Sequence, residues 1–94
     1  TAVTPYLVVY SLKTGRDHRR VGYTVSTKLG KAVVRNRVRR RLREIYRLNA
    51  DKLIDNADLV IVARSRCVGG EYAKMEKAFL RACAELKLLR EDGE

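Results

Sequence analysis

The sequence predicts a small α+β domain, in which a mixed sheet of three or four strands packs against two main helices. Three observations lead to this prediction. The chain has 94 residues, so we expect residues 1–94 to form one domain with a modest core. Hydrophobic residues make up 46% of it, too many for a disordered basic tail. Segments typical of strands and helices follow one another in the order strand, strand, helix, strand, helix.

Two segments near the N-terminus have the composition of strands. Residues 6–12 are β-branched and aromatic, and residues 20–26 alternate between apolar and small polar side chains. In the second segment one face carries Val21, Tyr23 and Val25, and the other carries Gly22, Thr24 and Ser26. Because a short polar turn at residues 13–18 separates the two segments, we expect them to form a hairpin. Residues 1–4 are expected to add a short extended piece.

The rest of the chain predicts two helices and a buried strand. A helix is expected from about Ala32 to Leu48, with a short helical turn after it at residues 49–54. Residues 58–64 contain a continuous apolar run, Leu59 to Ala63, which suits an interior strand. The last helix is expected from about Glu71 to Leu89, and residues 90–94 are expected to fray. The apolar stripes of the two helices are Val34, Val38, Leu42 and Ile45, and Tyr72, Met75, Phe79, Ala82, Leu86 and Leu89.

Positive charge is concentrated in the first helix and the loop before it. The formal net charge is +10, and residues 28–47 carry nine Lys or Arg against one acid, Glu44. Such crowding of like charge costs self-repulsion, which a polyanion that displaces condensed counterions offsets. This window therefore predicts a nucleic-acid partner.

The arginines of this helix form a broad face beside the apolar stripe. Arg35, Arg39 and Arg43 recur at i, i+4 and i+8, and the neighbouring row contains Asn36, Arg40 and Arg47. The planar guanidinium grips phosphate in a bidentate manner and stacks on bases, so its repeated use favours RNA or DNA. Arg41 lies near the stripe and would have to snorkel past it. A solvated charged face is one alternative. A membrane-surface helix would need large exposed apolar residues, but Val34, Leu42 and Ile45 are needed for the core. A nuclear-localisation tract is usually flexible, whereas this segment is interleaved with core residues.

Two further surfaces could contact nucleic acid. If Val8 and Tyr10 lie beside Thr24 and Ser26, the sheet presents a shallow polar cleft with an aromatic platform for single-stranded RNA. The alternative is that Tyr6 and Tyr10 are ordinary strand residues that pack under a helix. The loop at residues 26–31 contains Gly30 and two lysines at the start of a helix, where anions are favoured, although its spacing is not that of a Walker loop.

No catalytic or metal-binding set is recognisable. His18 lies in a turn beside Asp17 and is expected to be solvated, and the acids are scattered. Two cysteines without ligand spacing predict neither a disulfide framework nor a zinc site, and Cys83 is expected to be a small buried residue on a helix. No membrane-spanning run or secretory signal is visible, so we expect a cytoplasmic location.

The segment from Arg20 to Glu44 resembles the signature of the bacterial ribonuclease P protein component. The shared pattern is Arg-Val-Gly, a Ser-x-Lys-x-Gly-x-Ala-Val loop, and an Arg-Asn-Arg motif with further basic residues. The later strand and last helix fit the family in order and spacing, so the resemblance covers nearly the whole chain. It implies the family's ribosomal-protein-like fold, with an unusual left-handed βαβ crossover.

The resemblance also implies an activity, in which the protein assists a catalytic RNA. That RNA, with Mg²⁺, removes the 5′ leader of precursor tRNA by endonucleolytic hydrolysis, while the protein binds both the ribonuclease P RNA and the leader. The residues implied for binding the catalytic RNA are Lys31, Arg35, Arg37, Arg39 and Arg40. Those implied for the leader are Val8, Tyr10, Thr24, Ser26, Lys28, Arg35, Asn36 and Arg43. The protein itself is expected to supply no catalytic residue and no metal ligand.

Members of this family usually begin with a further helix that carries a Phe-x-x-Val-Phe-like motif and forms one wall of the leader cleft. This sequence starts at Thr1, just before the first strand, so we expect the helix to be missing, either because the sequence is truncated or because this member lacks it. The sheet face left open would then be able to drive self-association. Two rival functions remain: a ribosomal or other structural RNA-binding module without a catalytic partner, and a stand-alone nuclease.

Overall fold

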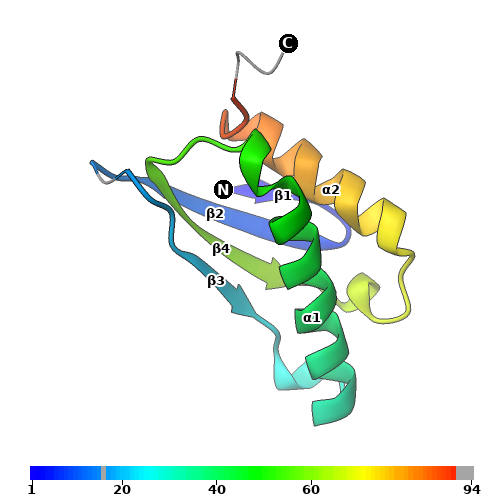
Figure 1. Cartoon of the computed structure of the whole chain (residues 1–94). Coiled ribbons are helices and arrows are strands. Elements are labelled where there is room, and N and C mark those ends of the chain that lie inside the picture. The colour runs from blue at the N-terminus through cyan, green and yellow to red at the C-terminus, as the bar shows by residue number, and fades with distance from the viewer. Residues whose placement is uncertain (16, 91–94) are drawn as a thin grey trace.

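A computed structural model describes residues 1–15 and 17–90 of the chain. Figure 1 shows one layer of strands with two helices packed on one side of it. Three single turns of 3-10 helix, η1 to η3, lie in the connections. The strands are β1 (Ala2–Val3), β2 (Leu7–Lys13), β3 (Val21–Thr24) and β4 (Ala57–Ala63); the helices are α1 (Ala32–Asn49) and α2 (Tyr72–Glu85); the turns are η1 (Thr27–Leu29), η2 (Ala50–Lys52) and η3 (Ser65–Cys67). The predicted α+β class is confirmed.

The strand order differs from the predicted hairpin. The order in the sheet is β1-β2-β4-β3, with β1 and β4 antiparallel to β2 and with β3 parallel to β4. The hairpin between residues 6–12 and 20–26 is therefore wrong, because β4 lies between them. The apolar β4 suits the interior of the sheet, as predicted. The connection at residues 14–20 is longer than a tight hairpin loop, so it allows β3 to lie one strand away.

The unit β3-α1-β4 joins two parallel neighbours through a helix on one face of the sheet. In Figure 1 α1 lies in front of the sheet. When the picture is turned so that the arrows of β3 and β4 point upward, β4 lies to the left of β3. A connection of this kind is left-handed, against the usual preference. The crossover that the family resemblance implies is therefore confirmed.

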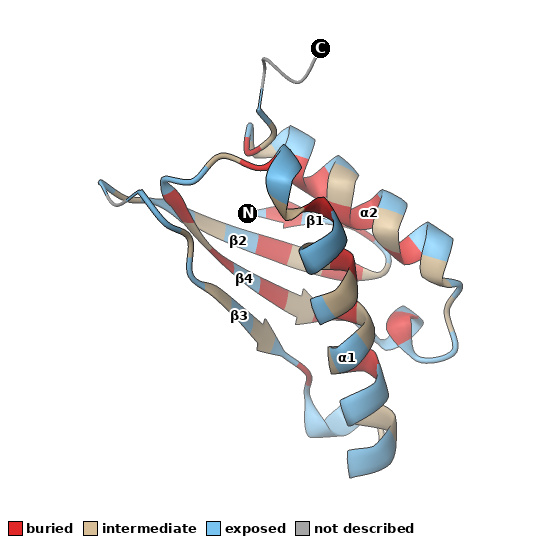
Figure 2. Ribbon diagram, viewed as in Figure 1, coloured by how far each residue is buried: buried red, intermediate tan, exposed pale blue. Residues whose placement is uncertain are grey.

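The core lies between the sheet and the two helices. Figure 2 shows buried residues along the inner sides of α1 and α2 and along alternate positions of β2 and β4. The predicted stripe of α1 is confirmed, with Val34 only half-buried at its N-terminal end. Cys83 is fully buried on α2, as predicted. The buried side chains with the largest share in this core are Leu7, Val9, Val38, Leu42, Ile45, Leu59, Ile61, Met75 and Phe79.

The second helix ends earlier than predicted. Lys87 has a left-handed conformation (φ 59°), and the N–H of Leu88 donates to the carbonyl of Cys83 (2.8 Å) while the N–H of Lys87 donates to that of Ala84 (3.0 Å). These two bonds form a Schellman cap, which ends a helix. The predicted continuation to Leu89 is wrong because the cap residue is Lys87, where glycine is the usual signal.

The segment after α2 is tied to η2. The N–H of Arg90 donates to the carbonyl of Lys52 (2.8 Å), and its guanidinium pairs with Asp55 (2.9 Å). The predicted fraying is therefore wrong for Arg90, and residues 91–94 lie outside the described residues. Across residues 1–15 and 17–90, neither helix has the length and apolar composition needed to cross a bilayer.

Arg19 fixes the C-terminal end of α1, although nothing in the sequence singles it out. Its guanidinium donates to the carbonyls of Ala50 (2.8 Å) and Ile54 (2.6 Å) and to the Tyr46 hydroxyl (2.9 Å). Because only 11% of the side chain is exposed, these bonds are protected from water. The basic helix is therefore held at a defined place on the scaffold.

Candidate RNA interface

The outer face of α1 is the first part of the candidate interface. Its buried stripe of Val38, Leu42 and Ile45 faces the sheet, and the arginine row faces outward and toward β3. A surface hollow there is lined without any acidic side chain by Val33, Asn36, Arg37, Arg39, Arg40 and Arg43. The only acid of the window, Glu44, is paired with Arg47 at 2.9 Å. The hollow is therefore a concentrated site of positive potential.

The arginine row is partly organised by its own contacts. Arg35 Nε donates to the carbonyl of Gly30 (3.2 Å), and Arg39 Nη1 donates to Asn36 Oδ1 (3.2 Å). The Arg43 guanidinium lies 5.8 Å from the centre of the Tyr23 ring, within the range of a cation–π contact. These side chains keep donors free for phosphate while their positions are restricted.

Arg41 is separate from this row. The half-buried side chain passes the apolar stripe, as predicted, and its Nη1 donates to the carbonyl of Gly70 (2.8 Å). One of its donors is thus committed to the protein. Arg41 therefore contributes charge and structure, and Arg37 and Arg40 are the more exposed neighbours.

The loop before α1 adds two exposed lysines beside a helix N-terminus. Ser26 Oγ accepts a hydrogen bond from the N–H of Lys28 (3.1 Å) and so caps η1. Gly30 has φ 147°, and a Cβ at this position would lie 3.1 Å from Val34, so glycine allows the tight approach of the loop to the helix. The N-cap residue Lys31 gives no side-chain cap to α1. The first N–H groups of the helix can therefore favour an anion.

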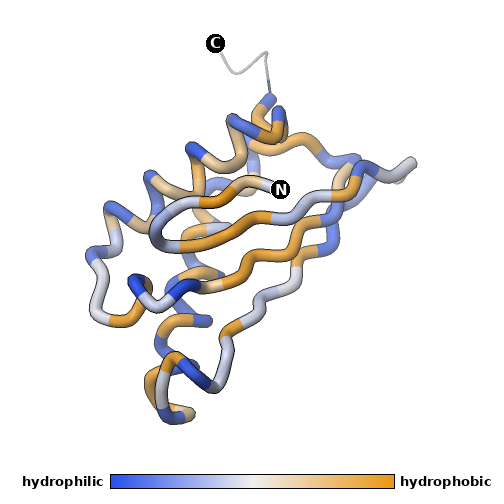
Figure 3. Tube along the Cα trace, turned by 180° about the vertical axis from the view of Figure 1, so that it is seen from behind, coloured by the Kyte–Doolittle hydropathy of each residue, from blue (hydrophilic) through white to orange (hydrophobic). Residues whose placement is uncertain are grey.

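The second part of the interface is the face of the sheet that neither α1 nor α2 covers, which we call the helix-free face. Figure 3, seen from behind, shows this face in front of both helices, with apolar residues along β2 and β4. The register places Val8, Val62 and Thr24 in one row across the sheet. The adjacent row contains Tyr10, Val60 and Gly22, and Tyr10 is 47% exposed. An exposed aromatic ring among small and apolar neighbours is suited to stack a base.

The predicted leader residues do not form a single patch. Val8, Tyr10 and Thr24 share the helix-free face, but β4 separates Thr24 from the other two. Ser26 and Lys28 lie on the loop beyond the end of β3. Arg35, Asn36 and Arg43 lie on α1, on the other side of the sheet edge formed by β3. The sites are thus distributed along a path around that edge.

Tyr6 does not join Tyr10 on the helix-free face. The strand begins only at Leu7, and the preceding turn points the Tyr6 ring toward Gly70 and α2. The sequence left two alternatives for these tyrosines, an exposed aromatic platform or packing under a helix, and each alternative is found for one of them. Tyr6 packs on the helix side, and Tyr10 is exposed.

Titration properties distinguish the buried groups from the interface. Burial raises the pKa of the Cys83 thiol to about 12, an effect that the Arg19 charge opposes. Burial also raises the pKa of Tyr23, as does Tyr46, while Arg43 lowers it. His18 is solvated beside Asp17, as predicted (3.5 Å). Among residues 1–15 and 17–90, no three His, Cys, Asp or Glu side chains are grouped so as to hold a metal ion.

Comparison with known proteins identifies close relatives in sequence. The Ribonuclease P family matches residues 1–87. The ribonuclease P protein component of Alkaliphilus oremlandii is 43% identical over 83 residues, covering 88% of this chain and 73% of that protein. The component from Natranaerobius thermophilus is 39% identical over 89 residues, covering 95% and 77%.

Solved structures support the same assignment. The ribonuclease P protein of Staphylococcus aureus superimposes with a TM-score of 0.81 at 26% identity, over 96% of this chain and 84% of that one. The protein from Thermotoga maritima gives a TM-score of 0.77 at 29% identity, over 86% and 78%. The fold, the basic helix and the family match agree over nearly the whole described chain, and the chain belongs to the ribonuclease P protein family.

Proposed function

We propose that this chain, as the protein subunit of ribonuclease P, binds the RNA subunit through the outer face of α1 and the 5′ leader of precursor tRNA across the helix-free face of the sheet. The observation that carries the proposal is the acid-free arginine face of α1, which is anchored by a buried apolar stripe. A general structural RNA-binding module would need only such a face. The family assignment favours the ribonuclease P role over that alternative.

The α1 surface supplies contacts of the kind that an RNA fold requires. Arg37, Arg39 and Arg40 line one hollow and lie in the row that points outward, so neighbouring phosphates can be bound together. Lys31 and Arg35 extend this surface to the helix N-terminus. Such contacts release counterions and make the affinity fall steeply with salt.

The leader is assigned to the helix-free face because a single strand has unpaired bases. Tyr10 offers a ring for stacking, and Gly22 and Thr24 leave room on the same face beyond Val60 and Val62 of β4. Ser26 and Lys28 continue the path at the end of β3, and Asn36 and Arg43 lie beyond the sheet edge. This path supports a strand that passes from the sheet face to the basic helix.

The chemistry is assigned to the RNA subunit and its Mg²⁺ ions. Among residues 1–15 and 17–90, no three His, Cys, Asp or Glu side chains are grouped so as to hold a divalent ion. The role that these residues support is electrostatic: they place positive charge beside the RNA and reduce its repulsion of the substrate.

Reconstitution tests the proposal directly. The purified protein is mixed with a bacterial ribonuclease P RNA and precursor tRNA at a magnesium concentration where the RNA alone is inactive. Restored cleavage at the 5′ end of the tRNA is the expected result. Tight RNA binding without cleavage would favour a structural RNA-binding module, and cleavage by protein alone after repeated purification would favour a stand-alone nuclease.

We also propose that the helix-free face of the sheet supports self-association when no RNA covers it. Val3, Leu12 and Val60 are 61%, 69% and 41% exposed and lie on or beside this face. Exposed apolar area of this kind favours association between copies. Analytical ultracentrifugation over a dilution series, with and without a short single-stranded RNA, would detect an RNA-sensitive dimer; sedimentation as a monomer throughout would contradict it.

A further inference from the structure

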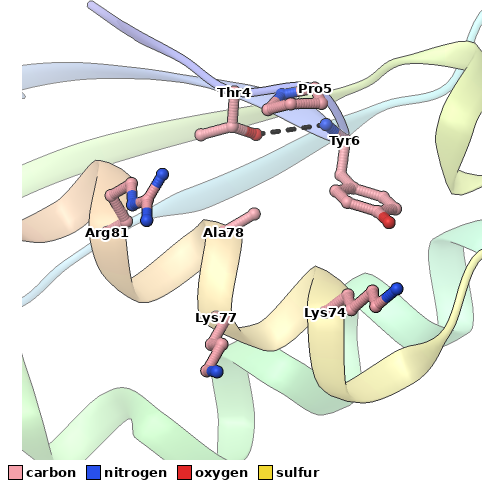
Figure 4. A pocket seen from close by; sticks show the side chains of 7 residues that line it. All are labelled: Thr4, Pro5, Tyr6, Lys74, Lys77, Ala78 and Arg81. Carbon is pink, nitrogen blue, oxygen red and sulfur yellow. Dashed lines mark hydrogen bonds between the residues drawn. The ribbon is translucent and has the colours of Figure 1, made fainter.

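A second basic surface lies on α2 and the turn between β1 and β2, and it shares no lining residue with the α1 hollow. Two adjoining hollows there have Thr4 and Pro5 in common, and the first has a volume of about 370 Å³. Neither is lined by an acidic side chain. We call this surface the α2 groove; Figure 4 shows its main part, and its cationic residues are Arg64, Arg66, Lys74, Lys77 and Arg81.

Three of these cations form one row on the helix. Lys74, Lys77 and Arg81 have spacings of three and four residues, and all three are exposed. The row spans roughly 10 Å along the helix axis. In DNA one strand carries a phosphate about every 3.4 Å of axis, so the row is about as long as three phosphate spacings of a nucleic-acid strand. Lys74 pairs with Glu71 at 3.4 Å, but both side chains are more than half exposed, so the pair is easily exchanged for another anion.

The wall opposite α2 is a rigid turn. The buried Thr4 hydroxyl donates to the carbonyl of Leu7 (2.8 Å) and accepts from the N–H groups of Leu7 (3.0 Å) and Tyr6 (3.2 Å). Pro5 restricts the backbone within this turn. Arg64 Nη1 donates to the carbonyl of Thr4 (2.9 Å), which joins the turn to the end of β4. The groove is thus formed before a ligand arrives, and less ordering is needed on binding.

The groove also has an aromatic surface. In Figure 4 the Tyr6 ring extends from the turn toward the helix that carries Lys74. A Cβ on Gly70 would lie 3.1 Å from this ring and 2.6 Å from the carbonyl oxygen of Arg66, so only glycine allows this close approach. A half-buried ring beside a row of cations combines base stacking with phosphate contacts.

We propose that the α2 groove binds a second segment of RNA, with its phosphates on Lys74, Lys77 and Arg81 and a base against Tyr6. The proposal rests on the proposed function, because it takes this RNA to be part of the ribonuclease P RNA. An anionic membrane fits less well, since it would require large apolar side chains that project past the cations. Here Ala78 is buried and Tyr6 is half-buried.

The test uses the full chain and matched double variants. Lys77→Ala/Arg81→Ala removes two charges from the groove, and Lys13→Ala/Lys52→Ala removes two exposed charges that line none of the three basic hollows. Affinity for ribonuclease P RNA is measured over a salt series, together with hydroxyl-radical footprints. The groove variant should bind about tenfold more weakly near 0.15 M salt, with the salt slope reduced by about 1.4–1.8. One protected RNA segment should be lost while the others remain.

Equal affinity, slope and footprint for the two double variants would overturn the α2 groove. If the groove variant loses binding to vesicles of phosphatidylcholine and phosphatidylglycerol but binds RNA as before, the α2 groove would also be overturned, in favour of a membrane surface. Arg39→Ala/Arg40→Ala separates this question from the proposed function. If that variant keeps full RNA affinity, the assignment of α1 fails. If it loses RNA affinity while the groove variant keeps it, only the α2 groove is refuted. Thermal unfolding of each variant confirms that the fold is intact.

Discussion

The two faces of the sheet are built from similar residues but have different surroundings. On β4, Ile61 is 1% exposed beneath the helices, whereas its neighbour Val60 is 41% exposed on the other face. The same contrast holds on β2 between Val9, fully buried, and Tyr10, 47% exposed. Both faces have β-branched and aromatic side chains suited to a strand. The arrangement of the helices therefore decides which of these residues stabilise the fold and which remain available for a ligand.

The clearest way to break this comparison is to truncate the two neighbours on β4. Ile61→Ala should lower the free energy of unfolding by about 3 kcal/mol, because it leaves a cavity in the packed core. Val60→Ala should lower it by less than about 1 kcal/mol, because much of that side chain is already in water. Urea denaturation of both variants measures the difference. Equal losses would mean that the helix-free face is covered by protein in solution.

Tyr10 tests whether the exposed face has the role assigned to it. Tyr10→Ala should weaken binding of precursor tRNA relative to mature tRNA by about 1–3 kcal/mol, if a leader base stacks on the ring. Tyr10→Phe keeps the ring and should keep the discrimination. Affinities of the reconstituted complex for the two RNAs provide the measurement. An identical loss for both RNAs would remove Tyr10 from the leader path.

Cys83 sharpens the comparison from the buried side. Its pKa is raised to about 12 in the fold from an ordinary value near 9, so the native state keeps the proton that the unfolded chain releases. This contribution to stability is fully present below pH 9 and is lost as pH rises toward 12. Relative to Cys83→Ala, the native chain should lose roughly 1.4 kcal/mol of stability between pH 8 and pH 10. Chemical denaturation at several pH values measures it, and parallel curves would show that the thiol is accessible.

The smallest effect is expected at the outer face of α1. Arg40→Ala should reduce the salt slope of binding to the RNA subunit by about one, and should cost less than about 1 kcal/mol of affinity. Stability should not change, since Arg40 is exposed. Filter binding at several salt concentrations gives the slope. A slope identical to that of the unmodified protein would exclude a phosphate contact at this position.

Sequence patterns predict the elements of this protein better than their pairing. The apolar run within residues 58–64 indicates an interior strand, and Val38, Leu42 and Ile45 indicate the buried side of α1. Neither pattern reveals that β4 separates β2 from β3, because a strand's periodicity describes its faces and not its neighbours. The end of α2 was also beyond prediction, since Lys87 occupies the left-handed position where glycine would be the signal.

The two basic surfaces differ in how easily they can be recognised in the sequence. The α1 surface is visible in the sequence because its arginines are consecutive and follow one helical period. The α2 groove is not, because Arg64 and Arg66 lie before the helix and Lys74, Lys77 and Arg81 are interspersed with acids. Outside residues 28–47 the charges of the chain nearly cancel, and only the fold separates the cations from the acids. Alternation alone predicts Tyr6 on the same face as Tyr10, but the turn at Thr4 interrupts the alternation before Leu7.

The hydrogen bond from Arg41 to Gly70 joins α1 to the segment that leads into α2. With RNA on both basic surfaces, this bond and the core shared by α1, α2 and the sheet would hold the two surfaces at a fixed separation. The second RNA contact would then form at a local concentration set by the protein's dimensions, without a further search through solution. Folding of the large RNA would thereby be guided by the distance between two sides of a 94-residue protein.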